Sequence, residues 1–338
     1  FYKKQKDGSL RHETEVIVDR GIEFLKSQPK GKPFALNMWF NACHAEDSDR
    51  RPGIGAFPWP RAVDGMYEDV VIAPPRLNSP AIFDDLPDFL KTTINRERYF
   101  WRWNTDERYQ TNMRAYYRMV SGIDGAIGRF MKTLEEAGLA DNTIIVYTSD
   151  HGSYRQERNG DLRGGKGALT EGGIRTPGII HWPNGIKEGQ IEATPASALD
   201  LLPTAVAMSG SEAPADLDGV DLMPYLQGES DSPPHETLYW RVAGGTGFAV
   251  RHGDWKLVRD SAMDEPKLYN LADDLGENDD LSAEEPAKLA ELLALYEQWS
   301  ATLETPRWSE GHTQNTTQER EAARRAGTRQ YPMPWGGE

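Results

Sequence analysis

The chain has 338 residues, of which 38% are hydrophobic and 27% are charged, and its net charge at neutral pH is −15. This composition supports a sizeable core and excludes a chain that is disordered throughout. The acidic balance argues against a nucleic-acid-binding protein, and no run approaches the ~18 apolar residues of a membrane span. Cys43 is the only cysteine, which excludes an internal disulfide and a cysteine-based metal site.

Helix-type and strand-type patterns alternate over the first two thirds of the chain. The expected elements are helices over 12–27 and 104–137 and short buried strands over 34–40, 144–148 and 179–182. Asn104 with Glu107 fits a capping box at the start of the second helix. This alternation is typical of an α/β domain, whose active site lies at the carboxyl ends of the strands.

The pattern changes after about residue 235. Three short strand-type runs joined by turns that contain glycine predict a small antiparallel sheet, and an apolar helix pattern follows it. The runs cover 237–241, 247–251 and 255–258, and the helix covers 284–302. The polar segment 308–338 offers little to bury and is expected to be an extended tail.

Histidines follow two of the predicted strands. Asp150 and His151 come directly after 144–148, and His44 follows 34–40. A carboxylate beside an imidazole can bind a divalent cation. The alternative for Asp150 and His151 is a turn with an incidental histidine, and for His44 a loop histidine without a catalytic role.

The segment 160–167 reads GDLRGGKG and nearly matches a nucleotide-binding P-loop. That motif needs a strand directly before its first glycine and a Ser or Thr after the lysine, whereas Gly167 follows Lys166 here. We therefore reject a P-loop. What remains is a lysine in a glycine-rich turn that a compact anion can approach, or else a solvated loop lysine.

Arginine and tryptophan cluster before the long helix, at Trp101, Arg102 and Trp103. Such a cluster can hold an anionic sugar through charge and stacking. It can equally be a packed corner at the start of the helix, and the sequence leaves both interpretations open.

Taken together, these motifs closely resemble the signature of the type I sulfatases. The matching segments are 148–152 (TSDHG), 162–167 (LRGGKG), 171–177 (EGGIRTP) and 182–189 (WPNGIKEG), in that order. Flanking likenesses extend the resemblance over residues 10–300. It implies an alkaline phosphatase-like mixed α/β sheet flanked by helices, with a small C-terminal antiparallel-sheet subdomain.

The resemblance also implies a reaction and its residues. In that family a formylglycine attacks the sulfur of a sulfate ester while a divalent cation holds a sulfate oxygen. Asp150 and His151 would be metal ligands, Lys166 would bind the sulfate, and His44 would bind sulfate and assist the leaving oxygen as general acid. The residues expected to contact the rest of the substrate are Arg102, Trp103, Arg155 and Arg163.

Two departures from the family pattern matter. The C/S-x-P-x-R motif that yields formylglycine is not in the chain, and Cys43 does not stand in it. We therefore expect formylglycine, and other ligands, in an N-terminal segment of the same protein that lies outside this chain. His151 stands where many members have asparagine, so Ca²⁺ is expected and Mn²⁺ or Zn²⁺ is possible.

These expectations combine into one functional hypothesis. Residues 1–234 would be the C-terminal part of a sulfatase catalytic domain and 235–307 the small subdomain. The complete protein would be a sulfuric ester hydrolase that releases sulfate from a sulfated glycan or other small sulfate ester. It would be exported to the periplasm, the cell exterior or the lysosome. The alternatives are a phosphonate or phosphodiester hydrolase of the same superfamily and a non-catalytic relic.

Overall fold

A computed structural model describes residues 1–47, 56–74, 81, 94–153, 159–212, 214–242, 246–260 and 264–304. The chain divides into two compact units. The first unit contains Phe1–Ile145 and His181–Gly185, and the second contains Val146–Ile180 and Ile186–Glu338.

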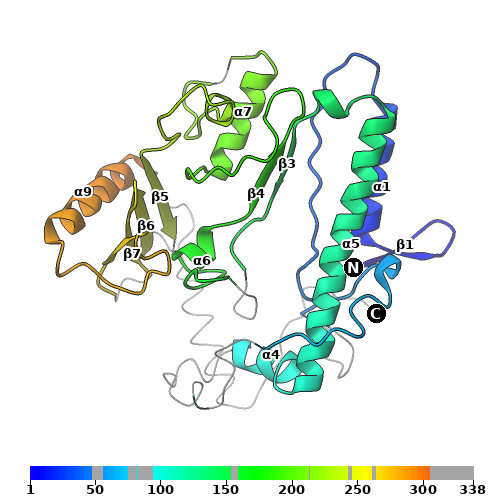
Figure 1. Ribbon diagram of the computed structural model, residues 1–338, viewed down its shortest axis with the longest axis horizontal. Helices are drawn as coiled ribbons and strands as arrows, with labels where there is room; N and C mark the ends of the chain where they lie inside the picture. The colour runs from blue at the N-terminus through cyan, green and yellow to red at the C-terminus, as the bar shows by residue number, and fades with distance from the viewer. Residues whose placement is uncertain are drawn as a thin grey trace. The chain divides into compact units, whose positions relative to one another are not determined.

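The first unit is built on two helices that lie side by side, α1 and α5 (Figure 1). Its elements in chain order are β1 (Tyr2–Lys4), β2 (Leu10–His12), α1 (Glu13–Ser27), a 3₁₀ turn (Arg61–Val63), α4 (Ile94–Arg102), α5 (Asp106–Glu136) and a second 3₁₀ turn (Ala140–Asn142). β1 and β2 form an antiparallel hairpin. The two long helices lie where the apolar spacing predicts them, because that spacing gives each an apolar stripe to bury against the other.

The start of α5 differs from the prediction. Thr105 is the N-cap, and its Oγ1 accepts a hydrogen bond from the Arg108 backbone N–H at 3.2 Å. Thr105 takes this role because its backbone is extended, with φ of −130° and ψ of 153°. The Asn104 side chain instead accepts from the Arg108 guanidinium at 2.9 Å, so the expected capping box is wrong.

The segment 34–40 is extended, but it forms no strand ladder with the part of the chain that the structure describes. Its alternate side chains Phe34, Leu36, Met38 and Phe40 pack against the core of α1 and α5, while Trp39 between them is 82% exposed. The strand prediction is therefore wrong here. Alternation records which side chains are half-buried, and a helix pair provides an apolar surface as well as a sheet does.

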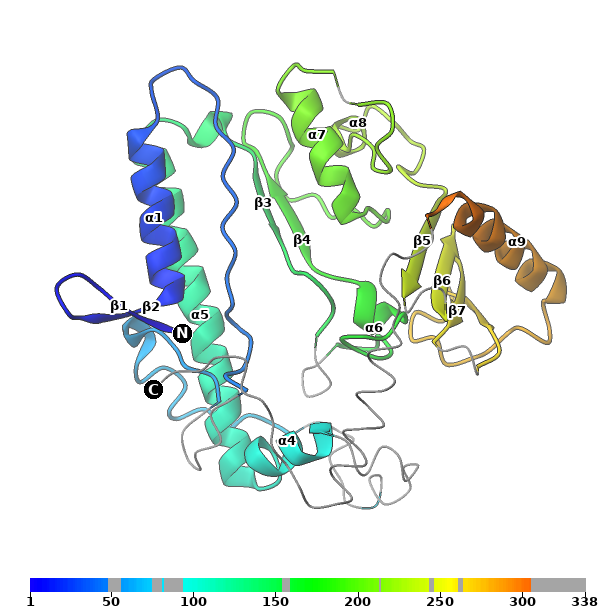
Figure 2. The same cartoon turned by 180° about the vertical axis from the view of Figure 1, so that it is seen from behind.

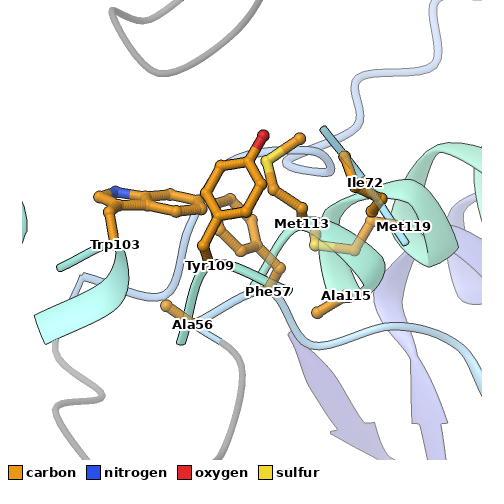
Figure 3. Close-up of a cluster of buried hydrophobic side chains, with 8 residues drawn as sticks. All are labelled: Ala56, Phe57, Ile72, Trp103, Tyr109, Met113, Ala115 and Met119. Atoms are coloured by element: carbon orange, nitrogen blue, oxygen red, sulfur yellow. The ribbon is translucent and has the colours of Figure 1, made fainter. Parts of the chain in front are cut away.

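A second core of the first unit lies at the N-terminal end of α5 (Figure 3). Its buried members are Ala56, Phe57, Ile72, Trp103, Tyr109, Met113, Ala115 and Met119. Asn112 is buried beside them, where its amide accepts from the Ala56 backbone N–H at 2.8 Å and donates to the Arg102 carbonyl at 3.1 Å. The irregular segment around Phe57 is thereby attached to the helix.

The second unit holds two sheets, although the terminal strand residues Ile145 and His181 belong to the first unit (Figure 2). Its elements are β3 (Ile145–Thr148), α6 (Glu171–Ile174), β4 (Gly178–His181), a 3₁₀ turn (Ala198–Asp200), α7 (Leu201–Met208), α8 (Met223–Leu226), β5 (Thr237–Val242), β6 (Gly247–His252), β7 (Trp255–Arg259), β8 (Lys267–Asn270) and α9 (Pro286–Thr302). β3 pairs with β4, and both strands expose most of their side chains. The predicted burial of these two strands is therefore not observed among the described residues.

The C-terminal sheet is antiparallel, with the order β5-β6-β7-β8. Helix α9 packs on it, and the Tyr296 ring stacks on Phe248 with 3.9 Å between the centroids. The predicted sheet and helix are confirmed. The predicted domain boundary between residues 234 and 235 stays a prediction. The predicted tail 308–338 lies outside the described residues.

Candidate functional site

Asp150 and His151 lie in the turn that follows β3. His151 Nε2 is 3.0 Å from Asp150 Oδ2, and His151 Nδ1 is 2.8 Å from the carbonyl oxygen of Gly152. The Asp150 side chain is 74% exposed and that of His151 is 34% exposed. The carboxylate and the imidazole therefore meet at an accessible position.

The hydrogen bond at Nδ1 fixes the tautomer of His151, and with it whether Nε2, which faces the carboxylate, carries a hydrogen or a lone pair. A carbonyl oxygen only accepts, so Nδ1 carries the hydrogen, and in the neutral ring Nε2 is the acceptor. A lone pair and a carboxylate oxygen at 3.0 Å repel each other unless a proton or a cation lies between them. The donor set, one carboxylate oxygen and one imidazole nitrogen, therefore fits a divalent cation.

This pair would supply two ligands. Within the described ranges, no group of three or more His, Cys, Asp or Glu side chains is placed to hold a metal ion. Because a bound divalent cation takes four or more ligands in general, the remaining ligands would come from other groups.

The glycine-rich segment is tied to this turn by backbone hydrogen bonds. The Lys166 N–H donates to the Ser153 carbonyl at 2.8 Å, and the Gly152 N–H donates to the Gly173 carbonyl at 2.8 Å. A Cβ at Gly152 would lie 2.0 Å from the Gly172 carbonyl oxygen, so only glycine permits this approach. The structure thus brings together the segments that carry Asp150, His151 and Lys166.

Lys166 itself is exposed. Its ammonium forms no ion pair with a carboxylate in the part of the chain that the structure describes. It is therefore available to an external anion at the surface of the glycine-rich turn.

His44 belongs to the first unit, in a turn closed by a hydrogen bond from its own N–H to the Asn41 carbonyl at 2.7 Å. Its ring is exposed, and Nδ1 lies 2.8 Å from the Ala45 carbonyl oxygen. As in His151, this places the hydrogen on Nδ1 and leaves Nε2 as the nitrogen that can accept or transfer a proton.

The Arg102 and Trp103 side chains form a packed corner, one of the two interpretations that the sequence left open. Arg102 is 6% exposed and donates to Asp47 Oδ1 at 2.8 Å, while Arg98 donates to Asp47 Oδ2 at 2.7 Å. Trp103 is 7% exposed within the core shown in Figure 3. Because Asp47 is three residues from His44, Arg102 holds the loop that carries this histidine.

The other two residues expected to contact the substrate are Arg163 and Arg155. Arg163 is exposed, and its Nη1 donates to the Glu277 carbonyl at 2.5 Å. Arg155 lies outside the described residues. A substrate contact by either arginine stays a prediction.

Two residues near the site were not predicted from the sequence. Asn159 donates from its amide to the carbonyls of Gly164 at 2.8 Å and Gly172 at 3.2 Å, and so bridges the glycine-rich segment. Lys256 on β7 is fully buried. The burial of Lys256 was indicated by its place between apolar residues in a predicted strand. Nothing in the local sequence indicates the role of Asn159.

Comparison with known proteins defines the class. Residues 1–211 match the family model described as Sulfatase, and residues 165–298 match the one described as N-sulphoglucosamine sulphohydrolase, C-terminal. This chain belongs to the sulfatase family, as the sequence motifs predict. Its fold class is the mixed α/β fold of the alkaline phosphatase-like type.

Particular relatives cover the chain to different extents. N-acetylglucosamine-6-O-sulfatase of Bacteroides thetaiotaomicron is 28% identical and aligns over 84% of this chain and 61% of its own length. Steryl-sulfatase of Mus musculus is 39% identical over 37% of this chain, which corresponds to 22% of its own length. The chain thus spans about a fifth to three fifths of these two relatives.

A solved structure in complex with its substrate D-glucosamine-2-N,6-O-disulfate also resembles this chain. The TM-score is 0.58 at 25% sequence identity, and the match covers 87% of this chain and 70% of the other.

Proposed function

We propose that the complete protein is a sulfuric ester hydrolase that releases inorganic sulfate from a sulfated carbohydrate. The observation that carries this proposal is the joining of Asp150, His151 and Lys166 by the backbone bonds of the glycine-rich segment. Together they would place a cation site and an ammonium group at one surface. Two positive charges there suit a sulfate ester and its product, the sulfate dianion.

The choice of a carbohydrate rests on the relatives that align over most of the chain. The relative that aligns over 84% of this chain is named an N-acetylglucosamine-6-O-sulfatase, whereas the steryl-sulfatase aligns over 37%. The complex with a sulfated glucosamine supports the same substrate class. A sulfated hexosamine is therefore the first substrate to test.

A carboxylate oxygen of Asp150 and Nε2 of His151 would hold the divalent cation. We expect Ca²⁺, with Mn²⁺ or Zn²⁺ as the alternatives that an imidazole ligand permits. When bound, such a cation supplies positive charge to a sulfate oxygen. The formylglycine nucleophile is expected in a part of the protein outside this chain.

The chain's own residues would act by charge and proton transfer. The Lys166 ammonium binds a sulfate oxygen and neutralises charge as the S–O bond breaks. The protonated His44 ring donates from Nε2 to the departing sugar oxygen, while Nδ1–H stays with the Ala45 carbonyl. Arg102 holds Asp47 and thereby the His44 loop.

We also propose that the complete protein is exported, as is usual for the family that it resembles. Among the described residues, no helix has the length and apolar character that crossing a bilayer requires.

Sulfate release from glucosamine 6-sulfate by the complete protein tests the function. We expect turnover that is lost on chelation and restored by added Ca²⁺. Turnover of a phosphonate monoester with no release of sulfate from any sulfate ester would instead establish the phosphonate hydrolase alternative. A protein that binds the sugar sulfate and turns over neither ester would be the non-catalytic relic.

Lys166→Ala is expected to lower kcat/KM by about 10²- to 10³-fold, the usual loss when one group that stabilises a developing anion is removed. Lys187→Ala is the matched control, because Lys187 is also an exposed lysine of the second unit and is not part of the site. Initial rates of sulfate release measure both. Equal activity of the two variants would contradict the role of Lys166.

A further inference from the structure

Three charged side chains are buried together beneath the glycine-rich segment. Lys256 of β7 and Glu277 are each 0% exposed, and Glu171 at the start of α6 is 3% exposed. The Lys256 ammonium is 2.7 Å from Glu171 Oε1 and 2.9 Å from Glu277 Oε1. Burial of charges is unfavourable unless each one is paired, so a cluster with this geometry has to be explained.

Glu277 contacts the chain on both sides of Lys166. Its carboxylate Oε2 accepts the backbone N–H of Glu171 at 2.7 Å, and its carbonyl oxygen accepts from Arg163 Nη1 at 2.5 Å. Arg163 and Glu171 stand on either side of Lys166 in the sequence. The backbone of Glu277 has φ of +52°, a left-handed conformation that is unfavourable for glutamate and that the surrounding contacts maintain.

The same contacts continue to the turn of Asp150 and His151. Gly172 and Gly173 follow Glu171 directly in α6. The Gly172 N–H donates to the Arg163 carbonyl at 2.7 Å, and the Gly173 carbonyl accepts the Gly152 N–H at 2.8 Å. An unbroken set of contacts therefore connects β7 of the C-terminal sheet with the residue next to His151, all within the second unit.

We propose that Glu277 and Lys256 are positioning residues, which hold the Lys166 segment and the Asp150–His151 turn in register through Glu171. This proposal rests on the proposed function for its catalytic consequence. A purely structural ion cluster would stabilise the unit without affecting where Lys166 lies. A positioning cluster would also determine where the Lys166 ammonium lies relative to the sulfate, and hence the rate of the chemical step.

Glu277→Gln in the complete protein tests the proposal. We expect kcat for glucosamine 6-sulfate to fall about 10- to 100-fold per folded molecule with KM within about twofold, because displacement of a group that stabilises the transition state reduces the chemical step. Glu277→Gly is the second variant. It also removes the carboxylate, but glycine tolerates the left-handed backbone, so this variant remains informative if Glu277→Gln does not fold.

His235→Gln is the matched control for lost stability. His235 Nε2 pairs with the fully buried Asp200 at 2.7 Å in the same unit, and the described hydrogen bonds of the Asp200 carboxylate go to Ser197, Val220 and His235 rather than to the glycine-rich segment. We expect it to lower the melting temperature while kcat per folded molecule is unchanged. If the Glu277 variants also lose only stability and keep kcat, the positioning role is overturned.

Hydrogen exchange supplies a readout that does not depend on activity. We expect the amides of Gly152, Lys166 and Gly172 to exchange at least about tenfold faster in Glu277→Gln, and to stay as in the wild type in His235→Gln. Unchanged exchange at these amides would overturn the proposal. If the wild type releases no sulfate, the proposed function fails, and the exchange experiment still decides whether Glu277 holds the segment.

Discussion

His12 caps α1 from a fully buried position, and both of its ring nitrogens are occupied. Nδ1 accepts the Thr14 N–H at 3.3 Å, and Nε2 lies 3.0 Å from the Pro58 carbonyl oxygen, to which it donates. This arrangement needs the neutral ring, because a protonated Nδ1 could no longer accept. Burial lowers the pKa of His12 below its ordinary value, against the opposing hydrogen bond to Pro58.

The stability of the first unit is therefore expected to depend on pH through His12. The unfolded chain takes up a proton near pH 6.5, whereas the folded chain does so only at lower pH. The contribution of His12 is present above about pH 6.5 and is lost as the pH falls through the folded pKa. Urea unfolding between pH 8 and pH 5 should show a decline that His12→Asn reduces.

Asparagine suits this experiment because it also caps helices, so part of the helix start is retained. His181→Asn is the control for the same substitution at an exposed histidine. An identical pH dependence in the wild type and in His12→Asn would show that His12 does not titrate as its burial indicates.

At the scale of elements, two glycines of α5 differ in the space around them. A Cβ at Gly122 would lie 2.4 Å from Pro60 Cγ, whereas a Cβ at Gly125 would meet nothing within 4 Å. Gly122 is therefore required for the packing of the segment around Pro60. Gly125 only weakens the helix.

We expect Gly125→Ala to raise the free energy of unfolding by about 0.5–1 kcal/mol, because alanine loses less backbone entropy in a helix. Gly122→Ala should lower it by about 1–3 kcal/mol, since the added methyl group overpacks against Pro60. Urea denaturation of both variants measures the difference. A stabilising Gly122→Ala would mean that Pro60 is not seated on α5.

At the scale of the whole molecule, β3 and β4 present apolar side chains to solvent. Val146 is 43%, Tyr147 is 42% and Ile179 is 58% exposed on these two paired strands. Successive residues of a strand point to opposite faces, so Val146 and Tyr147 expose apolar area on both faces of this two-stranded sheet. Exposed apolar area of this kind is covered by another surface or binds an apolar dye.

The chain of residues 1–338 by itself is therefore expected to bind the dye ANS. Replacement of Tyr147 and Ile179 by threonine should reduce the fluorescence, because threonine keeps the strand propensity and removes apolar area. Ile191→Thr is the control. Ile191 is 96% exposed but lies outside both strands, so it adds no patch. Equal dye binding in all three proteins would show that β3 and β4 are covered.

Predictions from the sequence succeeded where one local pattern decides the structure. The spacing of apolar residues places α1 and α5, and alternation with glycine turns places the C-terminal sheet. The strand prediction for 34–40 failed because a half-buried extended chain has the same pattern whether it pairs with a strand or lies on helices.

The sequence by itself determined the family and the identity of the candidate groups, since motif order and spacing are properties of the chain. Tertiary structure decided which of those groups are available. It places Arg102 and Trp103 inside the protein and leaves Lys166 exposed. It alone connects Lys256 and Glu277 with residues about a hundred positions away, because burial and charge pairing depend on distant segments that meet only in the folded chain.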